Sequence, residues 1–349
     1  MASLNLEQFG DLVELTVKKY IKSDYVSLLT DTTDHPAAKQ LINKNRMNGD
    51  EASPEGVQWK VRMGTANSYE HITPTTPDRT QMSDDFQHAS CPWRKTQVSY
   101  SFLEEQIDFN MGPLQIVNLV KAKEQGADFD WIEGMEEDFW SFPSAGDTNN
   151  YRSLPYWVVK NATEGFNGGT ATGYSDTGGL SGTTWPRWNN WSAQYTTISL
   201  DDLIKKCRTM AERTNFKPPV SGVPDLGATG PTRAYYTNLS VKQTFEDILD
   251  SRNDDLGTDI AKNDNETMFR KAPVEYVPML NSDTTNPIYQ LNWNVFKLMV
   301  RQRWWQRRTV LKPWPGQRNQ VAVFKDTYAN FACYNRRLCG VIATGTTYP

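Results

Sequence analysis

The 349-residue sequence has few of the residues on which catalytic and metal sites usually depend. Its three histidines, His35, His71 and His88, lie in polar segments, which argues against a histidine base or a histidine-based metal site. Its four cysteines form no C-x-x-C pair, so we expect ordinary buried thiols. The sequence also lacks the G-x-S-x-G, G-x-G-x-x-G and G-K-S/T motifs. We therefore predict no enzyme activity, no cofactor and no bound metal.

Long apolar runs are also missing. No stretch approaches the roughly 18–20 apolar residues that cross a bilayer, and the mean hydropathy is −0.65. The first 25 residues do not place an apolar core after a basic start, so we expect no signal peptide. The sequence predicts no membrane partner.

Aromatic residues are abundant instead: 12 Trp, 15 Tyr and 14 Phe, in a chain of formal net charge −4. Large aromatic side chains dominate the energetics of protein cores and interfaces. A chain this polar and this aromatic is expected to bury surface against copies of itself or against another partner.

The order of predicted elements indicates an α+β protein. Residues 5–22 have the spacing of an amphipathic helix, and the polar segment 30–56 has no core of its own. Apolar and polar residues alternate in 57–64 and 96–110, which predicts two strands of a long protruding hairpin. Residues 112–140 form the clearest helix, with Pro113 suited to its first turn.

Beyond residue 165 the pattern is mixed. The Gly-rich stretch 165–191 predicts a flexible loop, and Ser199 is a predicted cap for a helix over 199–214. Strands are predicted at 234–241 and 272–280, with a helix at 241–252 and an acidic region at 246–266. Residues 319–324 and 330–335, joined by "KDTY", predict a terminal hairpin, and 340–345 a last strand.

The stretch "RQRWWQRRTVLKPWPG", residues 301–316, is the main candidate site. Basic residues interleaved with aromatics are typical of nucleic-acid surfaces. Arginine also pairs with carboxylates and stacks on aromatic rings, which suits a protein interface equally well. The preceding residues keep helical spacing through Val295 and Met299. The residues alone leave both readings open.

Three other candidates are weaker. A cation site could use Asp254, Asp255 and Asp259, but the EF-hand pattern fails there because its first position would be Arg252. A glycan-binding protein could use the tryptophans of 185–191 as platforms. A glycosidase would need a carboxylate pair, yet the acidic residues of 133–138 are predicted to lie on the solvent-exposed face of a helix.

The element order resembles that of the major capsid proteins of tailed bacteriophages, of the Hong Kong 97 type. The segments "NPIYQLNWNVFKLMV", "KPWPGQ" and "NFACYNRRLCGVIATG" are similar to C-terminal segments of such proteins. The resemblance implies an N-terminal arm (1–56), an extended β-hairpin loop (57–105), a peripheral domain with a spine helix (106–165 and 285–349) and an axial domain (166–284). No long N-terminal scaffolding segment is expected, and no isopeptide pair can be assigned.

The resemblance also implies a function. Pentamers and hexamers of the chain would form an icosahedral shell around double-stranded DNA, contacted non-specifically. This shell would be a virion capsid assembled in the cytoplasm of a bacterial host, with a separate scaffolding protein, a portal and decoration proteins as further partners. An encapsulin-like nanocompartment is the alternative within the fold, and a nucleic-acid- or glycan-binding protein the alternative outside it.

In that context the candidate site falls in the peripheral domain, where subunits meet. The predicted interface residues are Arg301, Arg303, Trp304, Trp305, Arg307, Arg308 and Trp314. We expect the tryptophans to pack, and at least some of the arginines to pair with acids of adjacent subunits, in 246–266 or 133–138. Reversing the charge of Arg307 and Arg308 together should then block assembly and leave the monomer folded.

Overall fold

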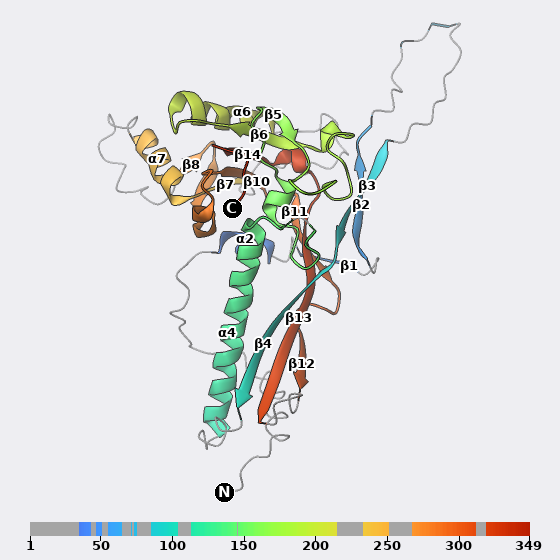
Figure 1. Cartoon of the computed structure of the whole chain (residues 1–349), viewed down its shortest axis with the longest axis vertical. Helices are drawn as coiled ribbons and strands as arrows, with labels where there is room; N and C mark the ends of the chain where they lie inside the picture. The colour runs from blue at the N-terminus through green and yellow to red at the C-terminus, as the bar shows by residue number, and fades with distance from the viewer. Residues whose placement is uncertain are drawn as a thin grey trace.

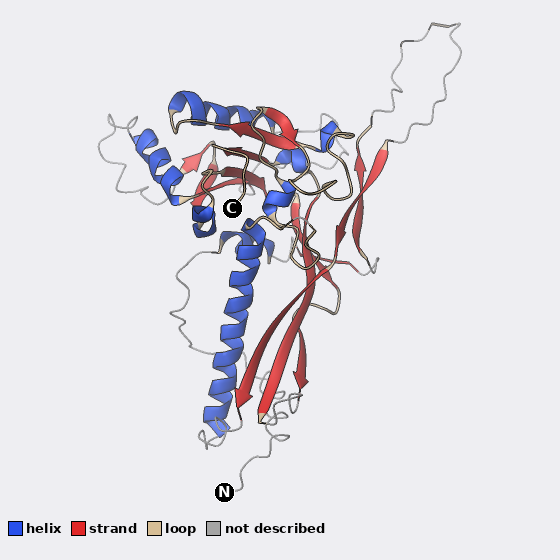
Figure 2. Ribbon diagram, in the orientation of Figure 1, coloured by secondary structure: helices blue, strands red, loops and turns tan. Residues whose placement is uncertain are grey.

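The computed structural model describes residues 35–42, 47–50, 55–64, 71, 73–74, 85–103, 113–144, 146–214, 233–250, 267–311 and 319–349. An elongated limb, made of one long helix beside a narrow sheet, extends from a broader part built on a second sheet (Figure 1). A two-stranded hairpin projects from the side of the molecule. Helices and strands both contribute to each part, as the predicted α+β class requires (Figure 2).

The helix of the limb is α4, Pro113–Trp140, which confirms the helix predicted over 112–140. Five residues predicted to share one face are buried: Val120, Ala127, Trp131, Met135 and Phe139. In the limb, Val120 and Ala127 pack with Tyr100 and Phe102 of the sheet. No helix within the described ranges is long and apolar enough to cross a membrane.

The sheet of the limb is organised around one long strand, β13. Its strands are β1 (Met47–Asp50), β4 (Arg94–Leu103), β11 (Phe296–Arg301), β12 (Arg307–Leu311) and β13 (Gln320–Cys333). Strand β4 pairs antiparallel along one side of β13. Strands β11 and β12 follow one another along the other side, and β1 pairs parallel with β11.

The predicted terminal hairpin is wrong, because β13 runs without a turn through "KDTY". Its residues Lys325 and Thr327 are 4% and 1% exposed and lie on the face that packs against α4. Because these buried positions hold polar residues, the apolar alternation of β13 is interrupted there, and the sequence pattern wrongly indicates a turn. The segment contains no Gly, Pro or Asn, which a two-residue hairpin turn would favour.

The projecting hairpin also differs from the prediction. Strand β2 (Gly56–Arg62) pairs with β3 (Phe86–Pro92), whereas β4, its predicted partner, belongs to the sheet of the limb. The sequence "FQHASCP" of β3 alternates weakly, because Phe86 is exposed and the buried residues are small. Its pattern therefore predicts part of the connecting loop and not a strand. Most of the residues between β2 and β3 lie outside the described ranges.

The broader part contains a seven-stranded sheet in the order β5-β6-β14-β10-β7-β9-β8. Its strands are β5 (Gly165–Gly168), β6 (Asn190–Gln194), β7 (Arg233–Thr237), β8 (Met268–Phe269), β9 (Ala272–Tyr276), β10 (Ile288–Asn292) and β14 (Gly340–Ala343). The helices around it are α5 (Leu154–Trp157), α6 (Lys205–Arg213) and α7 (Leu239–Asp250), with short turns η1 (Pro186–Trp188), η2 (Leu200–Ile204), η3 (Pro278–Ser282) and η4 (Arg336–Leu338). Ser199 caps the helical run as predicted, since its hydroxyl accepts the N–H of Asp202 at 3.3 Å.

Neighbouring residues of this sheet belong to two different cores, as the two-residue period of a strand requires. Tyr235 and Ile288 pack with helices α6 and α7, whereas Tyr236 and Tyr289 pack with the end of α4. There Phe139 makes close ring contacts with Trp293, Phe296 and Phe331. Much of the aromatic content predicted to serve interfaces therefore fills the junction between the limb and the broader part.

A short helix before the limb, α2 (Pro36–Leu41), is attached to α4 through Glu136. The Glu136 carboxylate accepts the N–H groups of Ala37 at 3.2 Å and Ala38 at 2.7 Å, and that of the Trp140 indole at 2.7 Å. Glu136 is 2% exposed, so its assignment to a wet helix face is wrong. Burial raises the pKa of this carboxyl, and these hydrogen bonds offset part of that shift. The predicted helix over 5–22 lies outside the described residues.

Candidate subunit interface

Residues 302–306 of the candidate site interrupt the run from β11 into β12. The carbonyl of Arg301 accepts the N–H of Trp304 at 3.1 Å, and the carbonyl of Trp304 accepts the N–H of Tyr328, on β13, at 3.1 Å. The N–H of Gln306 donates to the hydroxyl of Thr327 at 3.2 Å. The segment is therefore a five-residue bulge that stays bonded to β13 through Trp304 and Gln306.

The helical spacing read through Val295 and Met299 does not correspond to a helix. Strand β11 is buried along most of its length, so its apolar residues do not alternate and can be mistaken for one face of a helix. The bulge that follows requires two residues with positive φ, Arg303 at 68° and Gln306 at 46°. Neither residue type favours that region, which left no signal for the turn in the sequence.

One part of the site forms a stack on the sheet face that points away from α4. The Arg307 guanidinium lies 4.6 Å from the ring centroid of Trp304, and that ring packs against Tyr328 with centroids 4.8 Å apart. Arg301 lies 5.9 Å from the centroid of Tyr328. These are cation–π distances. We call Arg301, Trp304, Arg307 and Tyr328 the outer stack.

The adjacent Arg308 points to the opposite face, because successive residues of a strand alternate. It makes an ion pair with Glu124 of α4. Lys325 lies beside it in the register and approaches Glu124 at 3.3 Å and Asp128 at 2.6 Å. Arg308 therefore holds the helix of the limb to its sheet, within one chain.

The remaining predicted residues are divided in the same way. Trp305 packs edge-on against Trp131 of α4, with centroids 5.1 Å apart, so it belongs to the interior of the limb. Arg303 is exposed on the bulge. Trp314 lies outside the described residues. Of the predicted set, the structure brings Arg301, Trp304 and Arg307 together on one surface.

Arg308→Glu should lower the free energy of unfolding of the unassembled subunit by about 2–3 kcal/mol, because it removes a charged hydrogen bond and places a third carboxylate beside Glu124 and Asp128. Arg307→Glu is the matched control. It should cost under about 1 kcal/mol, since it removes a cation–π contact at the surface. Urea unfolding monitored by tryptophan fluorescence measures both. Equal effects would contradict the division of the two arginines between the faces.

The predicted acidic partners are also divided. Glu136 is occupied by α2, whereas Glu133 is half-buried and Glu137 is exposed. Asp138 is partly buried, and burial first, then the charges of Glu137 and Asp147, raise its pKa to about 6. In the region 246–266, Glu246 pairs with Lys242 at 3.7 Å. Residues 251–266, with the proposed cation ligands Asp254, Asp255 and Asp259, lie outside the described residues.

The tryptophans considered as a glycan platform do not form one. Trp188 and Trp191 are 2% and 6% exposed, and the Trp188 indole donates to the carbonyl of Thr177 at 2.8 Å. The Gly-rich stretch around them contains β5 and η1, and its residues range from buried to exposed. The four cysteines are buried and free, as predicted, and the described residues contain no cluster of His, Cys, Asp or Glu that could hold a metal ion.

Sequence reasoning missed the residues that complete the site from other strands. Tyr328 lies 24 residues after Trp304 in the sequence. Lys95 of β4 lies opposite Tyr328 in the strand register. The Lys95 ammonium lies 6.0 Å from the Tyr328 centroid and 3.2 Å from Asp326. Only the pairing of β13 with β4, β11 and β12 could have revealed them, and that pairing was not predicted.

No protein-family model matches the sequence, and no curated protein matches it either. Solved structures do match. A chain from the capsid asymmetric unit of cyanophage A-1(L) has a TM-score of 0.65 at 13% identity and covers 96% of this chain and 99% of its own. A chain from the capsid of a native GTA particle has a TM-score of 0.58 at 9% identity and covers 93% of this chain and 95% of its own. A chain from the capsid of Myoviridae phage XM1 has a TM-score of 0.52 at 11% identity and covers 94% of this chain and 97% of its own. The chain therefore has the Hong Kong 97-type capsid fold that its element order predicted.

Proposed function

We propose that this chain is the major capsid protein of a tailed phage, which self-assembles into an icosahedral shell enclosing double-stranded DNA. The observation that supports this most strongly is the length of the likeness. Each of the three capsid chains matches at least 93% of this chain, and at least 95% of its own length is matched in return. The likeness extends over the whole subunit and is not confined to one domain that other proteins could share. Its role would be structural, with no reaction to catalyse.

Parts of the molecule that do not complete a core of their own support the same proposal. The hairpin of β2 and β3 projects from the side of the molecule (Figure 1). Among the described residues, no strand pairs with the outer edge of β12. Open strand edges and projecting hairpins are usually covered in the functional state of a protein. In a shell, neighbouring subunits would cover them.

The proposal includes the domain division that the resemblance implies, although β4, at the end of the extended-loop range, belongs to the sheet of the limb. The arm would comprise residues 1–56, the extended loop 57–105, the peripheral domain 106–165 with 285–349, and the axial domain 166–284. Pentamers and hexamers would form through contacts that include Arg301, Arg303, Trp304 and Arg307. Scaffolding, portal and decoration proteins would be further partners, the DNA would be contacted non-specifically, and the shell would assemble in the cytoplasm of the bacterial host.

The nanocompartment alternative shares the fold but would enclose protein. The three matched structures described above are each named as capsids, which favours a genome container. Mass spectrometry and nuclease protection of particles isolated from infected cells separate the two. Protected double-stranded DNA is expected, and particles filled with one enzyme would favour the nanocompartment.

Assembly of the purified protein tests the proposed function. We expect light scattering after size-exclusion chromatography to detect capsomers or shells, and negative-stain microscopy to show closed particles. A protein that stays monomeric from micromolar to millimolar concentration, with and without a co-expressed scaffold, would contradict the proposal.

A further inference from the structure

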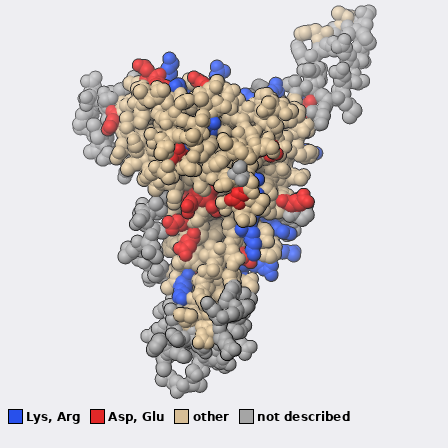
Figure 3. Space-filling view, viewed as in Figure 1, with Lys and Arg blue, Asp and Glu red and all other residues tan. Residues whose placement is uncertain are grey.

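The limb carries opposite charges on its two outer surfaces. In Figure 3, acidic side chains gather over the upper half of α4, and basic side chains lie on the sheet side of the limb at a similar height. The limb is only two layers thick, one helix and one sheet. Charges of opposite sign therefore face away from each other, on surfaces that one chain cannot bring into contact.

The helix surface is defined by Asp130, Glu133 and Glu137. Their spacing of three and four residues aligns them along one side of α4. That side is turned by roughly 100° from the one formed by Val120, Ala127 and Trp131, which is buried against the sheet. Asp130 and Glu137 are exposed and Glu133 is half-buried, and none forms an ion pair with another described residue. We call these three residues the acidic stripe.

The sheet surface is defined by the outer stack. Arg301 is held over Tyr328, and Arg307 is held over Trp304. Arg307 makes no ion pair with a carboxylate whose side chain the structure describes. In the register, Asp326 lies opposite Arg307 and is paired with Lys95, and Asp50 of β1 lies opposite Arg301. Stacking on an aromatic ring fixes a guanidinium while leaving its N–H groups available to a planar carboxylate. The outer stack is thus a preorganised site for carboxylates.

The hairpin of β2 and β3 covers the upper part of the same sheet face but not the outer stack. Trp59 of β2 packs against Tyr334 at 5.0 Å, and the Asn330 side chain donates to the carbonyl of Pro92 at 2.7 Å. Below these contacts, described residues leave Arg307 exposed. Only Ala329 lies between Asn330 and Tyr328 on β13, so the uncovered surface begins where the hairpin ends.

A second copy of the chain fits these two surfaces in only one manner. A two-fold contact would bring a surface against itself, acid against acid or base against base, which is unfavourable. A head-to-tail contact places the helix surface of one copy on the sheet surface of the next. Repeated head-to-tail contacts generate a ring when the rotation closes.

We propose that the acidic stripe of one copy binds the outer stack of the next copy, so that limbs alternate helix, sheet, helix, sheet around each ring. This inference rests on the proposed shell function and names the partner of the Arg/Trp site. The arginines pair with carboxylates of α4, and Glu136 takes no part because α2 occupies it. The nucleic-acid reading of the same arginines is an outcome of the test below.

Two charge-reversed proteins test the contact. The first carries Arg301→Glu and Arg307→Glu, and the second carries Glu133→Lys and Glu137→Lys. Each alone should lose at least about tenfold in capsomer yield, because like charges then meet at every contact. Mixed in equal amounts, they should regain hexamers, since alternating copies restore opposite charges at all contacts. Pentamers should not return, because an odd ring cannot alternate.

The outcomes are separable. If the unmodified protein forms no particles, the proposed function fails. If it forms shells and the first variant does so equally well, or if the mixture regains no hexamers, this inference fails while the function stands. Loss of DNA retention with normal shells for the first variant would overturn it in favour of the nucleic-acid reading. Where a reversed protein does not fold, Glu133→Cys with Arg307→Cys in one chain replaces it: oxidised particles should give a ladder of linked copies, and unlinked monomers would overturn the contact.

Discussion

Replacing Arg336 with alanine is expected to lower the free energy of unfolding by at least about 3 kcal/mol, the range for breaking a buried charged network. Arg336 lies in η4 and is 0% exposed. Its Nε donates to the carbonyl of Trp157 at 2.6 Å, and its Nη2 donates to the carbonyls of Gly168 and Gly169 at 3.1 and 2.6 Å. Truncation would leave these carbonyls buried without a donor and open a cavity around them.

The charge of Arg336 is unusual because its hydrogen-bond partners are carbonyls and the Asn190 side-chain oxygen, at 3.2 Å, with no carboxylate among them. Burial lowers its pKa to about 10, which still leaves it cationic at neutral pH. One side chain therefore joins α5, the loop after β5 and the start of β6. We expect this junction to form only when all three segments are in place.

The neighbouring Arg337 provides the matched control. It is half-buried and lies 3.9 Å from the ring centroid of Phe166, so Arg337→Ala should cost about 1 kcal/mol or less. Urea unfolding of the two variants gives the comparison. Arg336→Lys should fall between them, because a single ammonium cannot span three carbonyls. An Arg336→Ala protein as stable as Arg337→Ala would refute this role.

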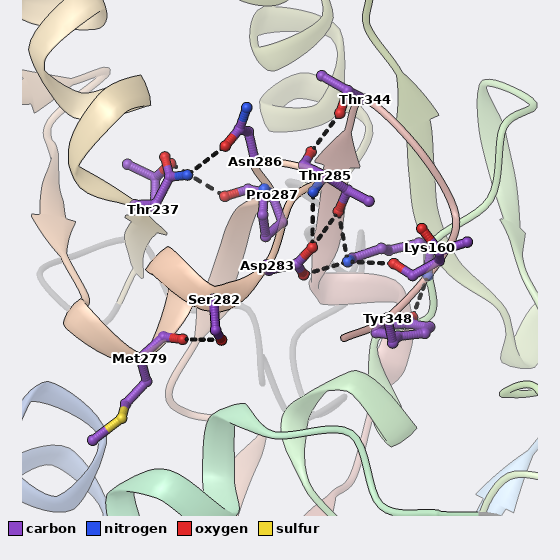
Figure 4. A network of polar contacts seen from close by, with 12 residues as sticks. Lys160, Thr237, Met279, Ser282, Asp283, Thr285, Asn286, Pro287, Thr344 and Tyr348 are labelled. Atoms are coloured by element: carbon purple, nitrogen blue, oxygen red, sulfur yellow. Dashed lines mark hydrogen bonds and ion pairs between the residues drawn. The ribbon is translucent and has the colours of Figure 1, made fainter.

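Replacing Lys160 with methionine should have an effect of similar size, about 3–5 kcal/mol, because it leaves Asp283 buried without its counter-ion. Lys160 and Asp283 are each 5% exposed and form an ion pair (Figure 4). The Lys160 ammonium also donates to the hydroxyl of Thr285 at 2.8 Å and to the carbonyl of Thr347 at 3.1 Å. Its backbone N–H donates to the hydroxyl of Tyr348 at 2.9 Å. One lysine thus ties residues 347–348 to the segment before β10.

A double-mutant cycle isolates this ion pair. The protein with both Lys160→Met and Asp283→Leu should be more stable than the one with Lys160→Met alone, because no uncompensated charge remains. Lys206→Met, at the less buried i,i+4 pair with Asp202, is the matched control and should cost about 1 kcal/mol or less. If Lys160→Met costs no more than Lys206→Met, the buried pair has no special role.

The sequence predicted those elements whose pattern is local. Helix α4 was predicted within one residue at its N-terminal end, since its buried residues recur at helical spacing over 28 residues. Strands β7, β9 and β14 were predicted from short apolar runs with turn residues between them. The element order then sufficed for the fold class, because this fold is distinguished by that order.

The errors have a common physical cause: a polar side chain was assigned to solvent when its partner was distant in the sequence. Glu136 binds N–H groups 98 and 99 residues away, and Lys325 binds Asp128 from 197 residues away. Each looks like a surface residue until its partner is known. The same limitation applied to the candidate site, where both arginines are exposed and only strand pairing separates Arg307, on the outer face, from Arg308, which pairs with Glu124 of α4.

An electron cryomicroscopy reconstruction of particles assembled from the unmodified protein tests the central claim most directly. The account predicts a closed icosahedral shell of pentamers and hexamers, in which the outer stack of each limb faces the acidic stripe of the next. A protein that forms only monomers or irregular aggregates under all assembly conditions would contradict it.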